Sequence, residues 1–280
     1  MRTAVVTGTT HGIGTITATR VAAAGYRLIM LVRDVHLAET LATTITAATG
    51  NHAIEVVLCD LSSIASVNDA VAEVLRRTSV IHLLINNAGT VIRRRTTSAD
   101  GIELTFATNH LGPFVLTTGL RTRLEVADAS RVVNVASAVY RNGSQDFETV
   151  LEPHGETGLR AYATSKLANV LFTLALHRRT RGTGITANCL HPGVVATNLA
   201  GDNRLLRLGM KLGRTLGIMR SPEQGAENTI QLALSVECAT ASGGYYDENM
   251  RRTVLSATAL NEEVQDRLWR FSEQLATRSA

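Results

Sequence analysis

The sequence predicts an α/β protein: a doubly wound parallel sheet with helices on both faces. Short runs rich in β-branched residues alternate with long Ala-, Leu- and Thr-rich stretches of helical periodicity. The runs are apolar on both faces, which is typical of interior strands that helices cover on both sides. The expected layers are therefore α/β/α. Six runs are predicted to be strands: Thr3–Val6, Arg27–Val32, Ile54–Cys59, Ile81–Ile85, Arg131–Val135 and Ile185–Leu190.

The chain is expected to form a single domain over residues 1–280. Its 280 residues, 45% of them hydrophobic, can bury one large core, and no low-complexity or Pro/Gly-rich linker divides them. The three cysteines are Cys59, Cys189 and Cys238. They are odd in number and lack paired metal-ligand spacing, so we expect buried free thiols and no metal site.

Charge and hydropathy exclude several classes of function. The net charge is +4, but the positive residues are scattered without interleaved aromatic residues, so no nucleic-acid partner is expected. The densest group, Arg93–Arg95, is interpreted as a solvated loop or helix start, with binding of an acidic partner or a substrate edge as the alternative. No signal peptide or membrane-spanning run is present. We therefore expect a cytoplasmic protein without a membrane anchor.

The first strand leads into a glycine-rich turn. In doubly wound sheets, ligands bind outside the carboxyl ends of the strands, so residues that follow each strand are candidates. Here Gly8, Gly12 and Gly14 precede a helix that runs through Ala24 and stops at Gly25. Such glycines allow a tight turn and close approach to a pyrophosphate at the helix N-terminus. A glycine turn without a ligand is the alternative, but its position favours a dinucleotide site.

The second strand favours NADP(H) as the cofactor. An NAD-specific protein usually has a carboxylate near Val32 for the ribose hydroxyls, and this chain has none. Arg33 follows instead, and a guanidinium matches a 2′-phosphate in shape and charge. The alternative is that Arg33 pairs with Asp34 or another surface acid. His11, beside the glycine turn, could assist, but a histidine is not a firm phosphate ligand near neutral pH.

The third and fourth strands end in further candidates. Asp60, which Leu61 follows, can accept a hydrogen bond from an adenine amine or cap the helix that starts nearby, and both interpretations stay open. The fourth strand ends in Asn86-Asn87-Ala88-Gly89. The small residues there would let the backbone pass close under a ribose.

A tyrosine and a lysine indicate acid/base chemistry. Ser137 follows the fifth strand, and Tyr162 and Lys166 open a long helix. Residues four apart lie on one helix face, so the ammonium is predicted to lower the pKa of the phenol. Taken alone, such a pair is more often a surface feature.

Taken together and in order, these motifs resemble the short-chain dehydrogenase/reductase family, over essentially the whole chain. The retinol-dehydrogenase-like branch is the most similar. The motifs are Thr-Gly-x-x-x-Gly-Ile-Gly, Asn-Asn-Ala-Gly, Ser137, Tyr162 with Lys166, and Pro192-Gly193. The segments that match the branch are Asn109–Phe114, Ser165–Phe172, Leu190–Gly193, Ser221–Ala226 and Leu268-Trp269-x-x-Ser272, with a long insertion between Ser137 and Tyr162. The resemblance implies a Rossmann fold.

The resemblance implies roles for individual residues. Tyr162 is the proton donor in reduction and the base in oxidation, while Ser137 orients and polarises the substrate oxygen. Asn109 anchors a water that links Lys166 to solvent. Thr197 bonds the nicotinamide carboxamide. The expected cofactor-binding set is Gly8, Thr10, His11, Gly12, Ile13, Gly14, Arg33, Asp60, Leu61, Asn87, Ala88, Gly89, Tyr162, Lys166, Pro192, Gly193, Val195 and Thr197.

The function implied is NADPH-dependent reduction of an aldehyde or ketone. A bulky apolar substrate, such as a retinoid, steroid or polyketide-like ketone, would lie against segments near 138–160 and 198–220. The second segment contains an apolar run that is either a lid or an ordinary amphipathic helix. The alternatives are NAD(P)-linked alcohol oxidation and a non-catalytic NADP-binding sensor. Family members commonly pair through the helices that contain Asn109 and Tyr162, so a homo-oligomer is one expectation.

Overall fold

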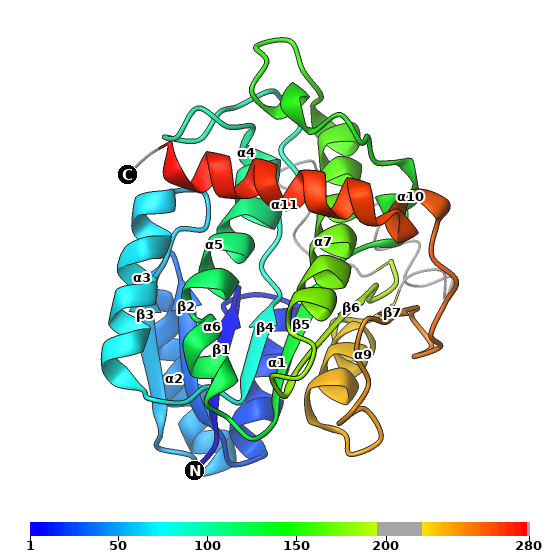
Figure 1. Cartoon of the computed structure of the whole chain (residues 1–280). Helices are drawn as coiled ribbons and strands as arrows, with labels where there is room; N and C mark the ends of the chain where they lie inside the picture. Colours follow the sequence, from blue (N-terminus) through cyan, green and yellow to red (C-terminus); the bar gives the residue numbers. More distant parts are fainter. Residues whose placement is uncertain (195–219, 279–280) are drawn as a thin grey trace.

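The computed structural model describes residues 1–194 and 220–278. In these residues, seven parallel strands form one sheet in the order β3-β2-β1-β4-β5-β6-β7 (Figure 1). The strands are β1 (Thr3–Thr7), β2 (Arg27–Val32), β3 (Ile54–Leu58), β4 (Leu83–Asn86), β5 (Ser130–Val135), β6 (Ile185–Leu190) and β7 (Tyr245–Tyr246). The predicted doubly wound parallel sheet is confirmed.

Strands β1, β3 and β5 differ from the prediction by one residue at one end, and β4, the edge at β3 and β7 differ in ways that have a physical reason. The fourth strand begins at Leu83 rather than Ile81 and runs on through Asn86, whose buried side chain donates to Asn134 on β5 and Thr117 on α5. Strand β3 lies at the sheet edge, and Leu58 at its end is 58% exposed, so the expected burial of both faces fails there. Strand β7 is an additional strand at the opposite edge.

Helices cover both faces of the sheet. The helical segments are α1 (Ile13–Ala23), α2 (Val35–Thr49), α3 (Ile64–Arg77), α4 (Leu104–Phe106), η1 (Ala107–Leu111), α5 (Gly112–Gly119), α6 (Arg121–Glu125), η2 (Ala138–Asn142), η3 (Phe147–Val150), α7 (Gly158–Arg179), α9 (Pro222–Leu234), α10 (Ala257–Leu260) and α11 (Glu262–Thr277). Side chains of α1, α2 and α9 pack together with one face of the sheet, and those of α3, α5 and α7 with the other. This arrangement gives the three predicted layers.

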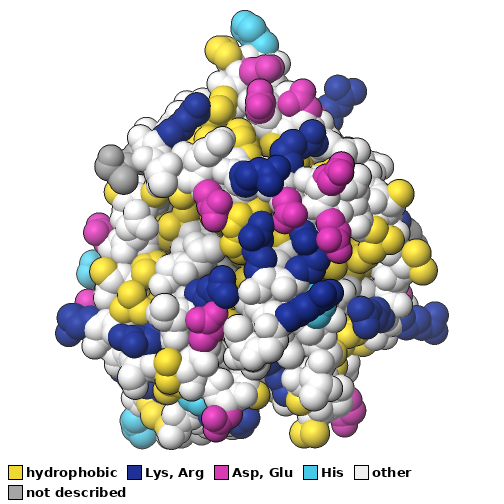
Figure 2. All heavy atoms as spheres, viewed as in Figure 1, with side chains coloured by type: hydrophobic (Ala, Val, Ile, Leu, Met, Phe, Trp, Pro, Cys, Tyr) yellow, Lys and Arg dark blue, Asp and Glu magenta, His cyan; other side chains and the backbone are white. Residues whose placement is uncertain are grey.

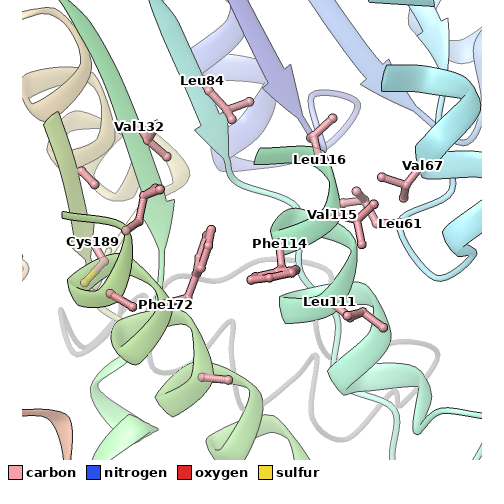
Figure 3. Packing of buried hydrophobic residues seen from close by; sticks show 14 of the residues in the cluster. Leu61, Val67, Leu84, Leu111, Phe114, Val115, Leu116, Val132, Phe172 and Cys189 are labelled. Atoms are coloured by element: carbon pink, nitrogen blue, oxygen red, sulfur yellow. The ribbon is translucent and has the colours of Figure 1, made fainter. Parts of the chain in front are cut away.

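The larger of the two main apolar clusters lies between the sheet and helices α3, α5 and α7. Figure 3 shows Phe114 of α5 and Phe172 of α7 projecting toward each other in this cluster, with ring centroids 5.5 Å apart. Cys59 and Cys189 are buried free thiols as predicted, whereas Cys238 is partly exposed. Burial raises the pKa of Cys59 and Cys189 to about 12, so neither is a thiolate near neutral pH.

Helix α11 forms an outer layer. It lies across α5 and α7 on the side away from the sheet (Figure 1). Its apolar side, which includes Leu268, Trp269 and Leu275, faces inward and is buried. Within residues 1–194 and 220–278, no helix is both long enough and apolar enough to cross a membrane.

Candidate active site

The turn after β1 contains three glycines, and two of them, Gly8 and Gly14, lie in contact. Gly8 and Gly12 have positive φ values of 67° and 55°, which glycine adopts without a steric penalty. A Cβ atom on Gly14 would lie 1.9 Å from the carbonyl oxygen of Gly8, so only glycine allows this approach. The predicted tight turn is confirmed, and α1 begins directly after it at Ile13. Nearby, the Thr10 hydroxyl lies 3.0 Å from Nδ1 of His11.

The end of β4 is tied to this turn. Nδ2 of Asn87 donates to the carbonyl oxygens of Thr7 and Gly8, at 3.1 and 3.0 Å. The Thr7 hydroxyl accepts from the amides of Asn87 and Ala88. Ala88 packs so closely that a Cβ on Gly8 would lie 2.7 Å from its Cα. The asparagine and small residues thus hold two adjacent strand ends together.

Arg33 lies at the end of β2 with an exposed side chain. In the described part of the chain it forms no ion pair. Its neighbour Asp34 is the N-cap of α2 and accepts from the amide of Leu37 at 3.0 Å. The alternative pairing of Arg33 with Asp34 therefore does not occur.

Asp60 does not cap a helix. Its Oδ1 accepts from the amide and the hydroxyl of Ser62, while the N-cap of α3 is Ser63. The capping interpretation is therefore wrong, because the chain makes one further turn before the helix begins. Leu61 is buried against Gly112 of α5, where a Cβ would lie 2.3 Å from the Leu61 carbonyl oxygen.

Ser137, Tyr162 and Lys166 meet at the carboxyl end of β5. The Ser137 side chain interacts with the phenol of Tyr162, and Nζ of Lys166 lies 5.5 Å from the centre of the phenol ring. Lys166 is 3% exposed and donates to the carbonyl oxygen of Val135 at 2.8 Å. The register of α7 on the sheet thus brings the predicted pair to the strand end.

The pKa of Tyr162 is raised, not lowered. Burial favours the neutral phenol, and the hydrogen bond with Ser137 only partly opposes this. Burial also lowers the pKa of Lys166 to about 8. The predicted lowering of the phenol pKa by the ammonium is therefore wrong in this structure, because desolvation is the larger effect. The phenol is therefore neutral and has a proton to donate.

Asn109 lies in the π-helical segment η1, where the chain makes one wider turn. Its Oδ1 accepts from the amide of Thr90 at 2.7 Å. Both hydrogens of its Nδ2 are donated, to the Thr90 carbonyl oxygen and to the hydroxyl of Ser165. A Cβ on Gly89 would lie 3.4 Å from Nζ of Lys166 and 3.6 Å from Oδ1 of Asn109, so the glycine backbone borders both groups.

His110, also in η1, is fully buried among Phe106, Phe114 and Phe172. Burial lowers its pKa to about 3, against an unfolded value near 6.5. Between these values the unfolded chain binds a proton that the folded chain does not, so stability falls as the pH falls through this window.

We expect His110 alone to lower the free energy of unfolding by about 2 kcal/mol between pH 7.5 and pH 5. Urea denaturation at both pH values measures this, and His110→Gln, which takes up no proton, should reduce the difference. Equal pH dependence in the variant and the wild type would contradict the prediction.

The remaining predicted residues lie near β6. Pro192 is buried, and Gly193 has a φ of 87° with its amide donating to Nδ1 of His191. Val195 and Thr197 lie outside the described residues. Most of segment 198–220 does too, including the apolar run.

The insertion at 138–160 packs on α7 and the loop before α4. Phe147 and Val150 are buried, and Gly143 touches Ala163 and Leu167. Arg95 donates to the carbonyl oxygens of Thr149, Val150 and Glu156. The interpretation of Arg93–Arg95 as solvated is therefore wrong for Arg95, because its guanidinium is hydrogen-bonded to the backbone of the insertion.

Two hydroxyl residues of this site were not predicted from the sequence. Thr7 joins β1 to β4, and Ser165 joins Asn109 to α7 by accepting from Nδ2 and donating to the carbonyl oxygen of Tyr162 at 2.7 Å. Each directly precedes a residue that was singled out. A polar side chain at the end of an apolar strand was the available signal for Thr7.

Among the described residues, no group of His, Cys, Asp and Glu could hold a metal ion.

A parallel α/β sheet with a glycine turn after β1 and a serine, tyrosine and lysine after β5 defines a dinucleotide-dependent oxidoreductase that acts on alcohol or carbonyl groups. The family profile described as short chain dehydrogenase matches residues 2–205. The chain belongs to this family, as predicted.

The relatives agree on the branch. The chain is 36% identical to retinol dehydrogenase 13 of Homo sapiens, over 98% of this chain and 84% of that protein. It is 36% identical to retinol dehydrogenase 12 of Mus musculus, over 97% of this chain and 85% of that one.

Solved structures agree on the fold. A protein of Mycobacterium paratuberculosis superposes with a TM-score of 0.77 at 29% identity, covering 99% of this chain and 93% of that one. RhlG of Pseudomonas aeruginosa, in an active-site complex with NADP, superposes with a TM-score of 0.69 at 25% identity, covering 88% and 94%.

Proposed function

We propose that this protein uses NADPH to reduce an aldehyde or ketone, with Tyr162 as the proton donor. The observation that carries the proposal is the cluster at the end of β5, where the Ser137 side chain interacts with the phenol of Tyr162 and the buried Lys166 lies beside its ring. In this proposal residues 1–280 act as one domain.

The residues at the strand ends fit a dinucleotide. The contact between Gly8 and Gly14 leaves no room for a side chain and makes the turn tight, and a tight glycine turn before a helix lets a pyrophosphate approach the backbone. The Thr9 hydroxyl, in the same turn, is buried without a partner among the described residues, and a phosphate oxygen is a group that would satisfy it. Asp60 keeps one carboxylate oxygen for an adenine amine, since Ser62 uses the other.

The charge at the end of β2 supports NADP over NAD. Arg33 is exposed, free of ion pairs in the described part of the chain, and has no carboxylate at Val32 beside it. A guanidinium there can pair with a 2′-phosphate. RhlG, which has a similar fold, was solved in complex with NADP, and this similarity also supports the choice of NADP.

Arg33→Ala should weaken NADPH binding about 10- to 100-fold, because a charge-assisted hydrogen bond contributes about 1.5–3 kcal/mol. NADH affinity should stay unchanged. Fluorescence titration of both cofactors measures the split, and Arg270→Ala, another exposed arginine on α11, serves as the control. Unchanged NADPH affinity in Arg33→Ala would favour an NAD-linked enzyme that oxidises alcohols.

The groups of the chain have distinct parts in the reduction. A bound dinucleotide would supply hydride for the carbonyl carbon. The Ser137 hydroxyl donates a hydrogen bond to the carbonyl oxygen, and Tyr162 gives that oxygen its proton, which completes the alcohol. The raised pKa of Tyr162 keeps the phenol protonated beforehand.

Lys166 and Asn109 have the role of replacing the proton that Tyr162 has donated. Asn109 has donated both amide hydrogens and has accepted one hydrogen bond at Oδ1, so one lone pair of Oδ1 is left for a water. Such a water, next to Gly89, would link Lys166 to solvent. Lys166 would also hold the nicotinamide ribose.

The substrate in this proposal is bulky and apolar. Its support is the names of the relatives, which are retinol dehydrogenases, together with the insertion at 138–160. NADPH oxidation with a panel of carbonyls, including retinal, steroid ketones and short aldehydes, tests the proposal. Tight NADPH binding without turnover of any member would instead indicate a sensor.

A further inference from the structure

Two segments that lie far apart in the sequence contact each other. One is Asn109–Phe114 in η1 and α5, and the other is Leu268–Ser272 in α11. Nε2 of His110 lies 2.9 Å from the hydroxyl of Ser272. The rings of Phe114 and Trp269 pack edge to face with centroids 5.0 Å apart. The C-terminal helix therefore meets the segment that contains Asn109.

The direction of the bond between His110 and Ser272 follows from its neighbour. The serine hydroxyl has one hydrogen, and it donates this to the carbonyl oxygen of Leu268 at 2.8 Å. Ser272 must then accept from His110, so Nε2 carries the proton of a neutral imidazole. Both side chains are fully buried, so no water competes for this bond.

The α11 side of this contact is held firmly. Arg178 of α7 donates to Gln265 and Asp266 of α11, at 3.0 and 2.8 Å. The guanidinium of Arg179 lies 4.5 Å from the Trp269 ring and also bonds Asp266. Figure 2, viewed from the side of α11, shows basic and acidic side chains interspersed over this face. Ser272 is thus a fixed acceptor.

We infer that His110 and Ser272 are positioning residues for Asn109. A π-helical turn is rare and needs tertiary contacts to persist. His110 of η1 is hydrogen-bonded to Ser272 of α11. The next residue in the chain toward the N-terminus is Asn109, whose side chain is hydrogen-bonded to Thr90 and Ser165. Since Ser165 in turn bonds the Tyr162 carbonyl oxygen, a loosened η1 would shift the reacting groups. The inference rests on the proposed function.

Ser272→Ala tests the inference. It removes one oxygen, and kcat for carbonyl reduction should fall about tenfold at 20 °C with the Kd for NADPH unchanged, because small displacements of reacting groups slow the chemistry. The Thr90 amide, measured by NMR hydrogen exchange, should exchange faster. His110→Phe removes the same bond from the other side, and the double variant should lose no more activity than either single one.

Val264→Ala is the matched control. Val264 is buried on the same helix α11, eight residues before Ser272, which is about 12 Å along the helix axis. This variant should lower Tm while kcat and Thr90 exchange stay as in the wild type. If Ser272→Ala lowers only Tm, the inference is overturned. If the wild type reduces no carbonyl at all, the proposed function fails, while Thr90 exchange still decides whether Ser272 holds Asn109.

Discussion

Replacing Tyr162 by phenylalanine should lower kcat for carbonyl reduction by about 10²- to 10⁴-fold, the range that general acid catalysis contributes. Burial keeps the phenol protonated, and the substitution removes the oxygen that donates the proton while it keeps the ring. NADPH oxidation under saturating substrate measures the loss.

The control for Tyr162→Phe is Tyr26→Phe. Tyr26 is buried beside α1, and its ring lies under the Arg2 guanidinium at 4.5 Å, away from the strand ends that form the site. Its variant should keep wild-type kcat and wild-type affinity for NADPH. Full activity in Tyr162→Phe would remove the phenol from the mechanism.

Gly14→Ala should lower the free energy of unfolding by about 3 kcal/mol and abolish measurable NADPH binding. The added Cβ would lie 1.9 Å from the Gly8 carbonyl oxygen and 2.6 Å from Nδ2 of Asn87. Two backbone segments must then separate, and overpacking of this kind costs about 1–3 kcal/mol or more. Urea denaturation and fluorescence titration measure the two effects.

Gly25→Ala is the control for Gly14→Ala, because it adds backbone strain without a steric clash of the new Cβ atom. Gly25 has a φ of 78°, but a Cβ there would meet nothing within 4 Å. Its cost should be about 1 kcal/mol from the left-handed conformation alone, with NADPH affinity unchanged. A Gly14→Ala protein that binds NADPH normally would show that this turn does not receive the cofactor.

The strands that form the sheet centre were predictable because burial on both faces leaves an apolar run. Strands β1 and β4 are buried throughout. Strand β7 was not predictable, since Tyr245–Tyr246 is too short to have a periodicity and pairs with residues more than fifty positions earlier. The end of β4 was misjudged because Asn86 has a polar side chain that is satisfied only across the sheet.

In the site, the strand-end rule located residues but not their environments. Ser137, Tyr162 and Lys166 do come together. The direction of the Tyr162 pKa shift depends on burial by distant segments, which spacing along α7 does not reveal. The clamp of Asn109 on Thr90 and Ser165 likewise depends on a π-helical turn that no local pattern indicates.

The position of α11 affects how two copies of the chain could pair about a two-fold axis. Trp269 lies against both Phe114 of α5 and Phe172 of α7, at 5.0 and 5.8 Å between ring centroids. An isologous two-fold contact through these helices needs the same apolar surface on each copy. Here one chain has already covered that surface with its own C-terminal helix. Two copies related by such an axis would meet first at the charged outer side of α11.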